Sequence, residues 1–284
     1  MELIRSLVAL RSRAEEARAS ARTVGLVPTM GALHAGHASL VQRAARECGA
    51  VVVTLFVNPL QFGPSEDLAT YPRDLATDSV AAAGAGATHL FAPDAGEMYP
   101  SGFSTSVRVA GPTEVLEGDS RPGHFEGVTT VVAKLLAATG PCRAYLGEKD
   151  FQQLVVVRRM VADLSLPAEV VGCPIVREAD GLALSSRNAR LGETGRSPAS
   201  ALWRSLRAGR DLVESGEQAP GRVRSAMGAI LRAEPLVSVG YAEVVDPETL
   251  MAPESIEGEV RLLVAATVGG TRLIDNVAAC GPSG

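Results

Sequence analysis

Short apolar runs alternate with longer stretches of helical periodicity over the first two-thirds of the chain, and this alternation limits its possible folds more than any other feature. The apolar runs lie at 24–27, 51–57, 88–91 and 143–146, and the helical stretches at 36–48, 73–83, 127–138 and 150–164. Strands separated by helices predict a parallel sheet covered by helices on both faces. We therefore expect a Rossmann-like, doubly wound α/β fold.

The pattern changes after residue 176. Two helical segments, near 197–214 and 222–233, precede apolar runs at 240–245 and 260–268, and the pair Gly269-Gly270 follows as a turn between antiparallel strands. We predict two domains, a Rossmann-like one over 1–176 and a smaller α+β one over 177–284. At the start of the chain, residues 1–6 alternate in a helical rhythm.

Composition excludes several classes of protein. A formal net charge of −5 gives no overall basic field for nucleic acid. No apolar run reaches the length of about 18 residues that a membrane span needs, and residues 1–6 begin no signal peptide. The four cysteines are scattered, without a C-x-x-C pair. These features indicate a cytoplasmic protein without a membrane anchor, a disulfide framework or a structural zinc site.

The loop after the first apolar run carries the motif H-x-G-H at His34-Ala35-Gly36-His37. A P-loop reading fails because His37 stands where lysine belongs and Ala38 where serine or threonine should bind Mg²⁺. A zinc site would need a third ligand, and a chance pairing of two histidines is the remaining alternative. Gly36 lets a nucleotide approach the backbone, and the N-terminus of the following helix attracts phosphate. The two histidines can donate hydrogen bonds to phosphate oxygens.

Two further polar segments fall at predicted strand ends, the edge where parallel sheets bind ligands. Asn58 and Gln61 carry amides that suit a small ligand with hydroxyl and carboxylate groups, although an Asn-Pro turn with a solvated Gln61 fits the spacing equally well. The segment 147–150 includes Lys149, one of only two lysines among 27 basic residues. A compact ammonium there suits phosphate, whereas a solvated helix start capped by Asp150 is the plainer alternative.

The last polar segment is Leu184-Ser185-Ser186-Arg187-Asn188. Its two hydroxyls and one guanidinium can bind phosphates and close over a site. On its own, this combination more often forms a turn.

Four stretches together resemble the pantothenate synthetase family of the H-x-G-H nucleotidylyltransferase superfamily. They are Pro28-Thr29-Met30-Gly31-Ala32-Leu33-His34-Ala35-Gly36-His37, the segment 56–63, Gly147-Glu148-Lys149-Asp150 and the segment 184–188. The family has methionine where this chain has Leu184. Similar stretches at 121–128 and 241–246 extend the resemblance over nearly the whole chain. Within 121–128 lies His124, for which we expect a role in ordering a loop.

The resemblance implies ATP-dependent ligation of pantoate and β-alanine through pantoyl adenylate, with release of AMP and pyrophosphate. It implies Mg²⁺ with the ATP, a homodimer, and a smaller domain that acts as a lid. His37, His34 and Lys149 are implied as catalytic, and Gln61, Gln153 and Asn58 as binding pantoate and β-alanine. The implied ATP-binding residues are Met30, Gly31, Ala32, Leu33, His34, Ala35, Gly36, His37, Gly147, Glu148, Lys149, Asp150, Val176, Leu184, Ser185, Ser186 and Arg187.

No protein ligand for a metal is assigned, although Asp78 is a candidate to help hold Mg²⁺. Two rival functions remain open at this point. One is a different H-x-G-H nucleotidyltransferase, whose product would be a stable nucleotide conjugate. The other is a nucleotide-binding regulator without catalysis, which the joint presence of all the expected phosphate-binding residues disfavours.

Overall fold

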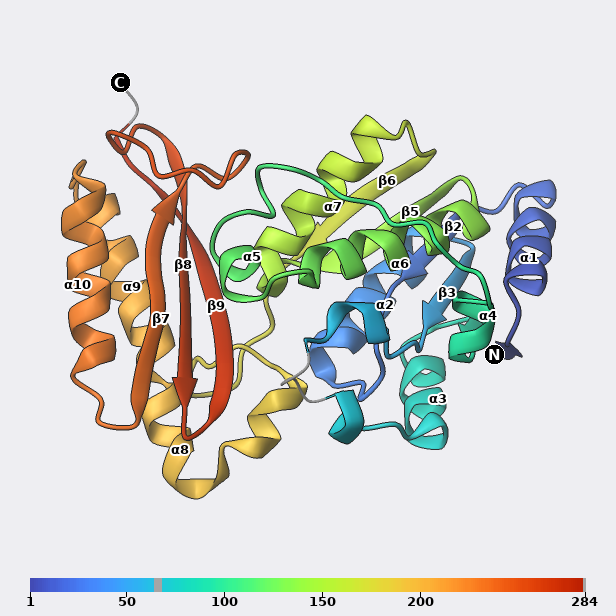
Figure 1. Cartoon of the computed structure of the whole chain (residues 1–284), viewed down its shortest axis with the longest axis horizontal. Helices are drawn as coiled ribbons and strands as arrows, with labels where there is room; N and C mark the ends of the chain where they lie inside the picture. The colour runs from blue at the N-terminus through green and yellow to red at the C-terminus, as the bar shows by residue number, and fades with distance from the viewer. Residues whose placement is uncertain (64–67, 283–284) are drawn as a thin grey trace. The chain divides into compact units, whose positions relative to one another are not determined.

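The computed structural model describes residues 1–63 and 68–282. Within these ranges the chain divides into two compact units, one of residues 1–148 and 152–174 and one of residues 149–151 and 175–284. Figure 1 labels most of the helices and strands. None of the described helices combines the length and the apolar character that a bilayer crossing requires.

The first unit contains a sheet in which every pair of neighbouring strands is parallel, in the order β1-β4-β3-β2-β5-β6. Its strands are β1 (Glu2–Ile4), β2 (Val24–Val27), β3 (Ala50–Thr54), β4 (His89–Phe91), β5 (Cys142–Gly147) and β6 (Ala168–Cys173). Its helices are α1 (Leu7–Ala19), α2 (Ala35–Glu47), α3 (Leu75–Gly84), α4 (Ala95–Met98), α5 (Glu117–Ser120), α6 (His124–Thr139) and α7 (Phe151–Asp163).

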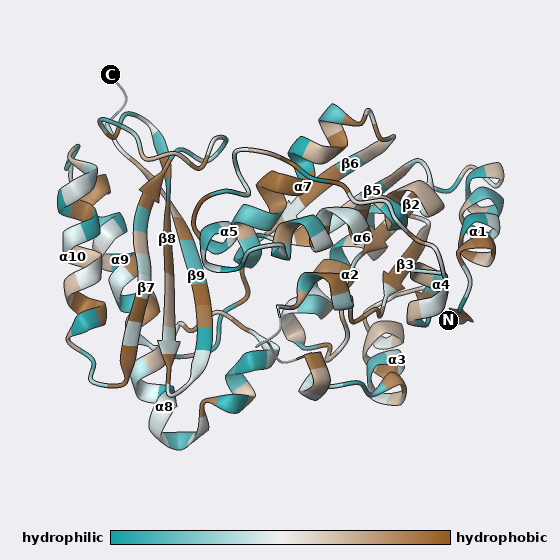
Figure 2. Cartoon of the chain, in the orientation of Figure 1, coloured by the Kyte–Doolittle hydropathy of each residue, from teal (hydrophilic) through white to brown (hydrophobic). Residues whose placement is uncertain are grey.

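Alternate residues of the buried strands belong to two separate cores. Val24 and Leu26 pack with residues of α1, α6 and α7, whereas Val27 and Val53 pack with residues of α2 and α3. Side chains of successive strand residues point to opposite faces, so each core lies on its own face of the sheet. This arrangement confirms the predicted doubly wound fold. In Figure 2 strand β3 is hydrophobic along its length, as a strand buried on both faces should be.

Two predictions for the first unit need correction or addition. Residues 2–4 form strand β1, paired with β4, rather than helix, because Ile4 is buried against the sheet. Helix α1 begins only at Leu7, after Ser6 caps it by accepting a hydrogen bond from the amide of Ala9. Strand β6 was not predicted, since it is a half-exposed edge strand without a continuous apolar run.

The second unit is an antiparallel sheet in the order β7-β8-β9 with α9 and α10 packed on it. Its elements are α8 (Gly192–Ala199), α9 (Ala201–Glu214), α10 (Pro220–Arg232), β7 (Val237–Val245), β8 (Glu259–Val268) and β9 (Thr271–Cys280). Gly269 and Gly270 form the predicted turn between β8 and β9, and both have positive φ, +54° and +85°. Two positive φ angles define the tight turn that glycine favours in hairpins.

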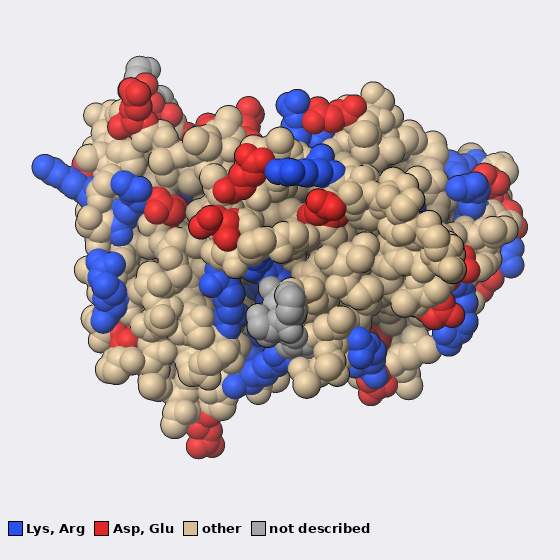
Figure 3. All heavy atoms as spheres, in the orientation of Figure 1, with Lys and Arg blue, Asp and Glu red and all other residues tan. Residues whose placement is uncertain are grey.

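Charges of both signs are interspersed on the face drawn in Figure 3. Many charged side chains of the described residues are paired: Arg13 on α1, for example, lies 2.9 Å from Glu2 and 2.8 Å from Glu16. A surface with charges of both signs agrees with the modest net charge of the sequence.

Candidate active site

The strand order reverses between β2 and β5, which are neighbours in the sheet although β3 and β4 lie between them in the chain. The connections from β2 to β3 and β4 run toward one edge, and the connection from β5 to β6 runs toward the other. In doubly wound sheets the ligand crevice lies at this reversal, beyond the carboxyl ends of the strands. The loop after β2, which carries the H-x-G-H motif, and the end of β5 meet this condition.

Hydrogen bonds from two directions fix the loop after β2. Thr29 on one side donates through Oγ1 to the carbonyl of Thr54, at 2.5 Å. On the other side the carboxylate of Asp78 accepts from the backbone amides of Ala32, at 3.0 Å, and Leu33, at 2.7 Å. Gly31 has φ of +90°, and a Cβ there would lie only 2.8 Å from a carboxylate oxygen of Asp78. The loop therefore needs glycine at this position.

His34 and His37 lie at the N-terminus of α2 with ring centroids 4.1 Å apart. Nδ1 of His34 accepts from the amide of Gly36, at 3.1 Å, and Nδ1 of His37 accepts from the amide of His34, at 3.4 Å. A neutral imidazole that accepts at Nδ1 carries its proton on Nε2. Both rings thus have the tautomer that donates through Nε2.

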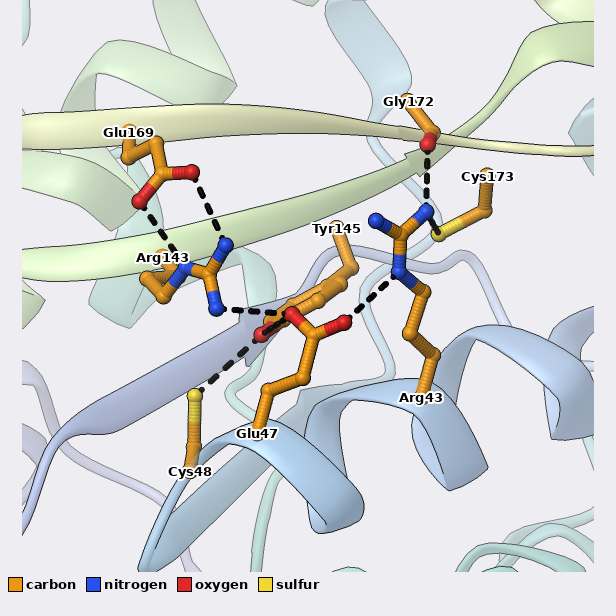
Figure 4. Close-up of polar contacts among 8 residues, drawn as sticks. All are labelled: Arg43, Glu47, Cys48, Arg143, Tyr145, Glu169, Gly172 and Cys173. Carbon is orange, nitrogen blue, oxygen red and sulfur yellow. Dashed lines mark hydrogen bonds and ion pairs between the residues drawn. The ribbon is translucent and has the colours of Figure 1, made fainter.

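The other end of α2 is tied to the sheet by the polar network in Figure 4. The carboxylate of Glu47 accepts from Arg43, at 2.9 Å, from Arg143 on β5, at 2.7 Å, and from the hydroxyl of Tyr145, at 2.8 Å. Arg43 also donates to the carbonyl of Gly172 on β6, at 2.8 Å. These bonds lower the pKa of Glu47, that from Arg43 most. The network fixes the direction of the helix that carries His34 and His37.

Asn58 caps the short 3₁₀ helix that follows β3, and Gln61 ends it, beside the loop after β2. Nδ2 of Asn58 donates to Oε1 of Gln61, at 3.1 Å. Nε2 of Gln61 lies 3.0 Å from the sulfur of Met30. The structure therefore brings Met30, Asn58 and Gln61 together, as expected if they line one site.

His124 contacts the backbone of the same segment. Its Nδ1 lies 2.8 Å from the carbonyl oxygen of Gln61, and its Nε2 lies 2.9 Å from Nη1 of Arg121. Since the guanidinium can only donate, Nε2 of His124 accepts. Its Nδ1 is therefore protonated and donates a hydrogen bond to the carbonyl oxygen of Gln61. His124 thus helps hold Gln61 in place, consistent with the loop-ordering role expected for it.

Three other predicted residues of the first unit lie at the end of β5 and the start of α7. Gly147 ends β5, Glu148 follows it, and Gln153 lies half-buried on the first turn of α7. Among the described residues the Gln153 side chain makes no hydrogen bond to Gln61 or to the two histidines. Its neighbour Gln152 is buried and holds backbone groups of the segment 112–117.

Lys149 and Asp150 belong to the second unit by their contacts. Nζ of Lys149 lies 3.5 Å from a carboxylate oxygen of Asp150. The carbonyl of Lys149 accepts a hydrogen bond, at 2.9 Å, from the side chain of Asn276 on β9. Asn276 in turn accepts, at 2.7 Å, from Nε of Arg261 on β8. Sequence reasoning missed Asn276 and Arg261, because they are more than 100 residues from Lys149.

The second unit also holds the predicted phosphate-binding loop. Leu184 pairs with Val176 through a backbone bond of 2.9 Å, and Ser185 begins the 3₁₀ helix that contains Ser186 and Arg187, accepting from the amide of Arg187 at 3.2 Å. The end of this segment is anchored by Asn188, which donates to Glu178 at 2.7 Å. The predicted residues 176 and 184–187 therefore form one continuous group.

A doubly wound sheet with H-x-G-H at the N-terminus of the helix after its β2 loop is the arrangement that suits an enzyme acting on the phosphates of a nucleotide. The family model of pantoate–β-alanine ligases matches residues 2–278. The chain therefore belongs to the pantoate–β-alanine ligases, the pantothenate synthetases.

Known relatives agree over nearly the whole length. The pantothenate synthetase of Moorella thermoacetica is 51% identical over 277 residues, 98% of each chain, and that of Deinococcus radiodurans is 52% identical over 93% of this chain and 96% of its own. The structure of pantothenate synthetase from Thermus thermophilus has a TM-score of 0.92 at 49% identity, over 98% of this chain and 99% of that one. The Francisella tularensis pantoate–β-alanine ligase, complexed with β-γ ATP and β-alanine, has a TM-score of 0.80 at 33% identity, over 98% and 97%.

Proposed function

We propose that the chain activates pantoate with ATP at the carboxyl edge of its parallel sheet and transfers the activated acyl group to β-alanine. The observation that carries this proposal is the pair His34 and His37, which lie on an immobilised loop at the reversal of strand order and share the tautomer that donates through Nε2. Membership in the pantoate–β-alanine ligases supplies the two acids that are joined.

The reaction has two steps. A carboxylate oxygen of pantoate attacks the α-phosphorus of ATP, the bond to the bridging oxygen breaks, and pyrophosphate leaves with that electron pair. The amine of β-alanine then attacks the acyl carbon of the pantoyl adenylate, loses a proton, and displaces AMP. Both partners of the first step are anionic, so catalysis consists largely of positioning and of stabilising the developing charge.

We assign charge stabilisation to His34, His37 and Lys149. The two histidines donate through Nε2 to oxygens of the phosphates, and the N-terminus of α2 adds its positive end. Lys149 provides a point charge. The remaining residues assigned to ATP are Met30, Gly31, Ala32, Leu33, Ala35, Gly36, Gly147, Glu148, Asp150, Val176, Leu184, Ser185, Ser186 and Arg187.

The acid substrates are assigned to Gln61 and Gln153, whereas Asn58, the third residue expected from the sequence, acts through its hydrogen bond to Gln61. The assignment of Gln61 is supported by the contact of its Nε2 with the sulfur of Met30, a residue of the loop after β2. The Francisella ligase is complexed with β-γ ATP and β-alanine, which supports ATP and β-alanine as substrates of this chain.

We propose that Mg²⁺ enters with ATP, held by phosphate oxygens. Among the described residues no group of three histidine, cysteine, aspartate or glutamate side chains is arranged to hold a metal. Asp78, the candidate from sequence, uses both carboxylate oxygens to hold the amides of Ala32 and Leu33. Its position fits a residue that shapes the loop better than one that binds the metal.

We further propose that residues 1–176 bind ATP and pantoate while residues 177–284 act as a lid, and that the enzyme is a cytoplasmic homodimer. Free cysteines support a reducing compartment: Cys48, Cys142 and Cys173 are buried without disulfide partners. Light scattering of the purified protein tests the dimer, and a mass equal to one chain would exclude it.

Release of pyrophosphate tests the proposed chemistry. With ATP and pantoate alone we expect one burst of pyrophosphate per site, and with β-alanine added we expect continuous turnover with AMP in equal amount. A stable nucleotide conjugate in place of AMP would identify a nucleotidyltransferase of another kind, and binding of ATP without pyrophosphate would identify a regulator.

A further inference from the structure

The amide of Asn58 uses its full hydrogen-bonding capacity within the protein. It is 1% exposed. Its Nδ2 donates to Oε1 of Gln61, at 3.1 Å, and to the carbonyl of Gly127, at 3.0 Å. Its Oδ1 accepts from the hydroxyl of Tyr99, at 2.7 Å, and from the amide of Leu60, at 3.3 Å. Two donated and two accepted bonds leave Asn58 no further group to offer a substrate.

Neighbouring groups that can play only one hydrogen-bonding role fix the orientation of the Asn58 amide. The carbonyl of Gly127 can only accept and the amide of Leu60 can only donate, so an exchange of Oδ1 and Nδ2 would break both bonds. With Oδ1 in this position, the hydroxyl of Tyr99 must donate. Burial raises the pKa of Tyr99 to about 12, so its hydroxyl keeps its proton at neutral pH.

The orientation of the Asn58 amide determines the orientation of the Gln61 amide. Because Nδ2 of Asn58 donates to Oε1 of Gln61, the amide nitrogen Nε2 of Gln61 faces the other way, toward the sulfur of Met30. The backbone carbonyl of Gln61 accepts from His124 and Arg121, so the backbone from which the side chain extends is held in place. What Gln61 presents beside Met30 is therefore a hydrogen-bond donor.

Tyr99 is held by packing of its ring. The ring lies 6.0 Å from that of Phe56 and 5.0 Å from that of Phe103, centroid to centroid. Nζ of Lys134 lies 4.7 Å from the centroid of Phe103 and 5.9 Å from that of Tyr99, within the range of cation–π attraction. Loss of the hydroxyl alone would therefore leave the ring in place.

We propose that Tyr99, Asn58 and Gln61 form a hydrogen-bond relay that presents Nε2 of Gln61, a donor, to a hydroxyl or carboxylate oxygen of pantoate. In this relay Asn58 and Tyr99 are positioning residues, which act through Gln61 and do not touch the substrate. The inference rests on the proposed function, specifically on the assignment of Gln61 to pantoate.

A double-mutant cycle on pantoate kinetics tests the relay. In Tyr99→Phe we expect the KM for pantoate to rise about fivefold, the scale of one buried neutral hydrogen bond, with the KM for ATP within about twofold of normal. In a Gln61→Ala background the same Tyr99→Phe change should alter the KM for pantoate less than about twofold, because the relay has lost its last member. An undiminished fivefold effect in that background would overturn the relay.

Gln61→Glu tests the direction of the amide. A glutamate keeps an oxygen for Nδ2 of Asn58 but replaces the donor with a second oxygen, so we expect a loss in kcat/KM for pantoate at least as large as that of Gln61→Ala. Retention of most activity would mean that Gln61 presents an acceptor, and the inference would be wrong.

Tyr145→Phe is the matched control. It also removes a tyrosine hydroxyl that is hydrogen-bonded within the first unit, to Glu47 and Cys48, and it should lower the melting temperature without raising the KM for pantoate. An equal rise there would show that Tyr99→Phe acts by general loosening. If Gln61→Ala itself leaves the KM for pantoate unchanged, the assignment of Gln61 in the proposed function fails, a result distinct from failure of the relay alone.

Discussion

Asp78 holds the loop that carries the candidate ATP-binding residues, and its replacement by alanine is the most direct test of how that loop works. The carboxylate is 4% exposed and accepts from the amides of Ala32 and Leu33, 46 and 45 residues away in the chain. Ala32 has φ of +51°, a left-handed conformation that costs a residue other than glycine about 1–2 kcal/mol. The two bonds offset this strain.

The expected loss follows from these contacts. A hydrogen bond to a charged group contributes about 1.5–3 kcal/mol, so two contribute about 3–6 kcal/mol. Asp78 also lines a cavity of about 390 Å³, through which water can reach the two amides in the variant and replace part of the loss. We therefore expect Asp78→Ala to lower the free energy of unfolding by about 2–4 kcal/mol.

Relaxation of Ala32 should also displace the backbone of Met30 to Leu33. A displacement of about 1 Å in a positioning segment can cost about 100-fold in rate. We expect kcat/KM for ATP to fall on the order of 10²-fold, measured as pyrophosphate release at saturating pantoate, while the KM for pantoate changes less.

Asp74→Ala is the control. Asp74 caps the same helix, α3, where its carboxylate accepts from the amide of Thr77, at 3.0 Å, and from its hydroxyl, at 2.7 Å. Loss of a cap should lower the melting temperature but leave the KM for ATP within about twofold. Equal ATP kinetics in the Asp74 and Asp78 variants would refute the reasoning. Recovery of the Asp78→Ala rate at raised Mg²⁺ concentration would also refute it, because that result would make Asp78 a metal ligand.

Three further predictions concern the phosphates and the second unit. His37→Ala should lower kcat about 10²–10³-fold, the effect of losing one oriented donor, and a full rate of adenylate formation would exclude that role. Lys149→Arg should lose most activity although the charge is kept, since a planar fork replaces a point charge; a near-normal rate would contradict this. Hydrogen bonds from Arg196 and then Asn188 lower the pKa of Glu178 below its usual 4.5, so its contribution to stability is present above pH 4.5 and lost as pH falls further. The difference in melting temperature between wild type and Glu178→Gln should therefore shrink below that pH, and a constant difference would count against it.

The parts of the fold that could be predicted from sequence depend on neighbours in the chain. Strand β2 is buried on both faces and reads as a continuous apolar run, the H-x-G-H motif lies within four residues, and the turn at Gly269-Gly270 needs only the two glycines. Strands β1 and β6 could not be predicted in this way, because they lie at the edges of the sheet and each is only partly buried.

The polar contacts that shape the site were beyond the reach of local pattern. An aspartate such as Asp78 on a helix surface resembles many solvated aspartates, and only the fold places it against Leu33. Likewise Tyr99 follows a short helix of four residues, and nothing near it in the sequence indicates that its hydroxyl meets Asn58, 41 residues earlier. The role of such residues becomes visible only when the structure shows which group completes their hydrogen bonds.

The position of Lys149 depends most clearly on residues that are distant in the chain. Its neighbours in the chain are the end of β5 and the start of α7, elements of the first unit, yet residues 149–151 group with the second unit. Asn276 holds the carbonyl of Lys149, and Arg261, which holds Asn276, lies 4.2 Å from the ring centroid of Phe151. The backbone on which the proposed phosphate-binding ammonium sits is therefore fixed by β8 and β9. It follows that the position of Lys149 depends on residues of the smaller unit that bind no ligand in our proposal, and that substitutions in β9 should be judged by their effect on ATP as well as on stability.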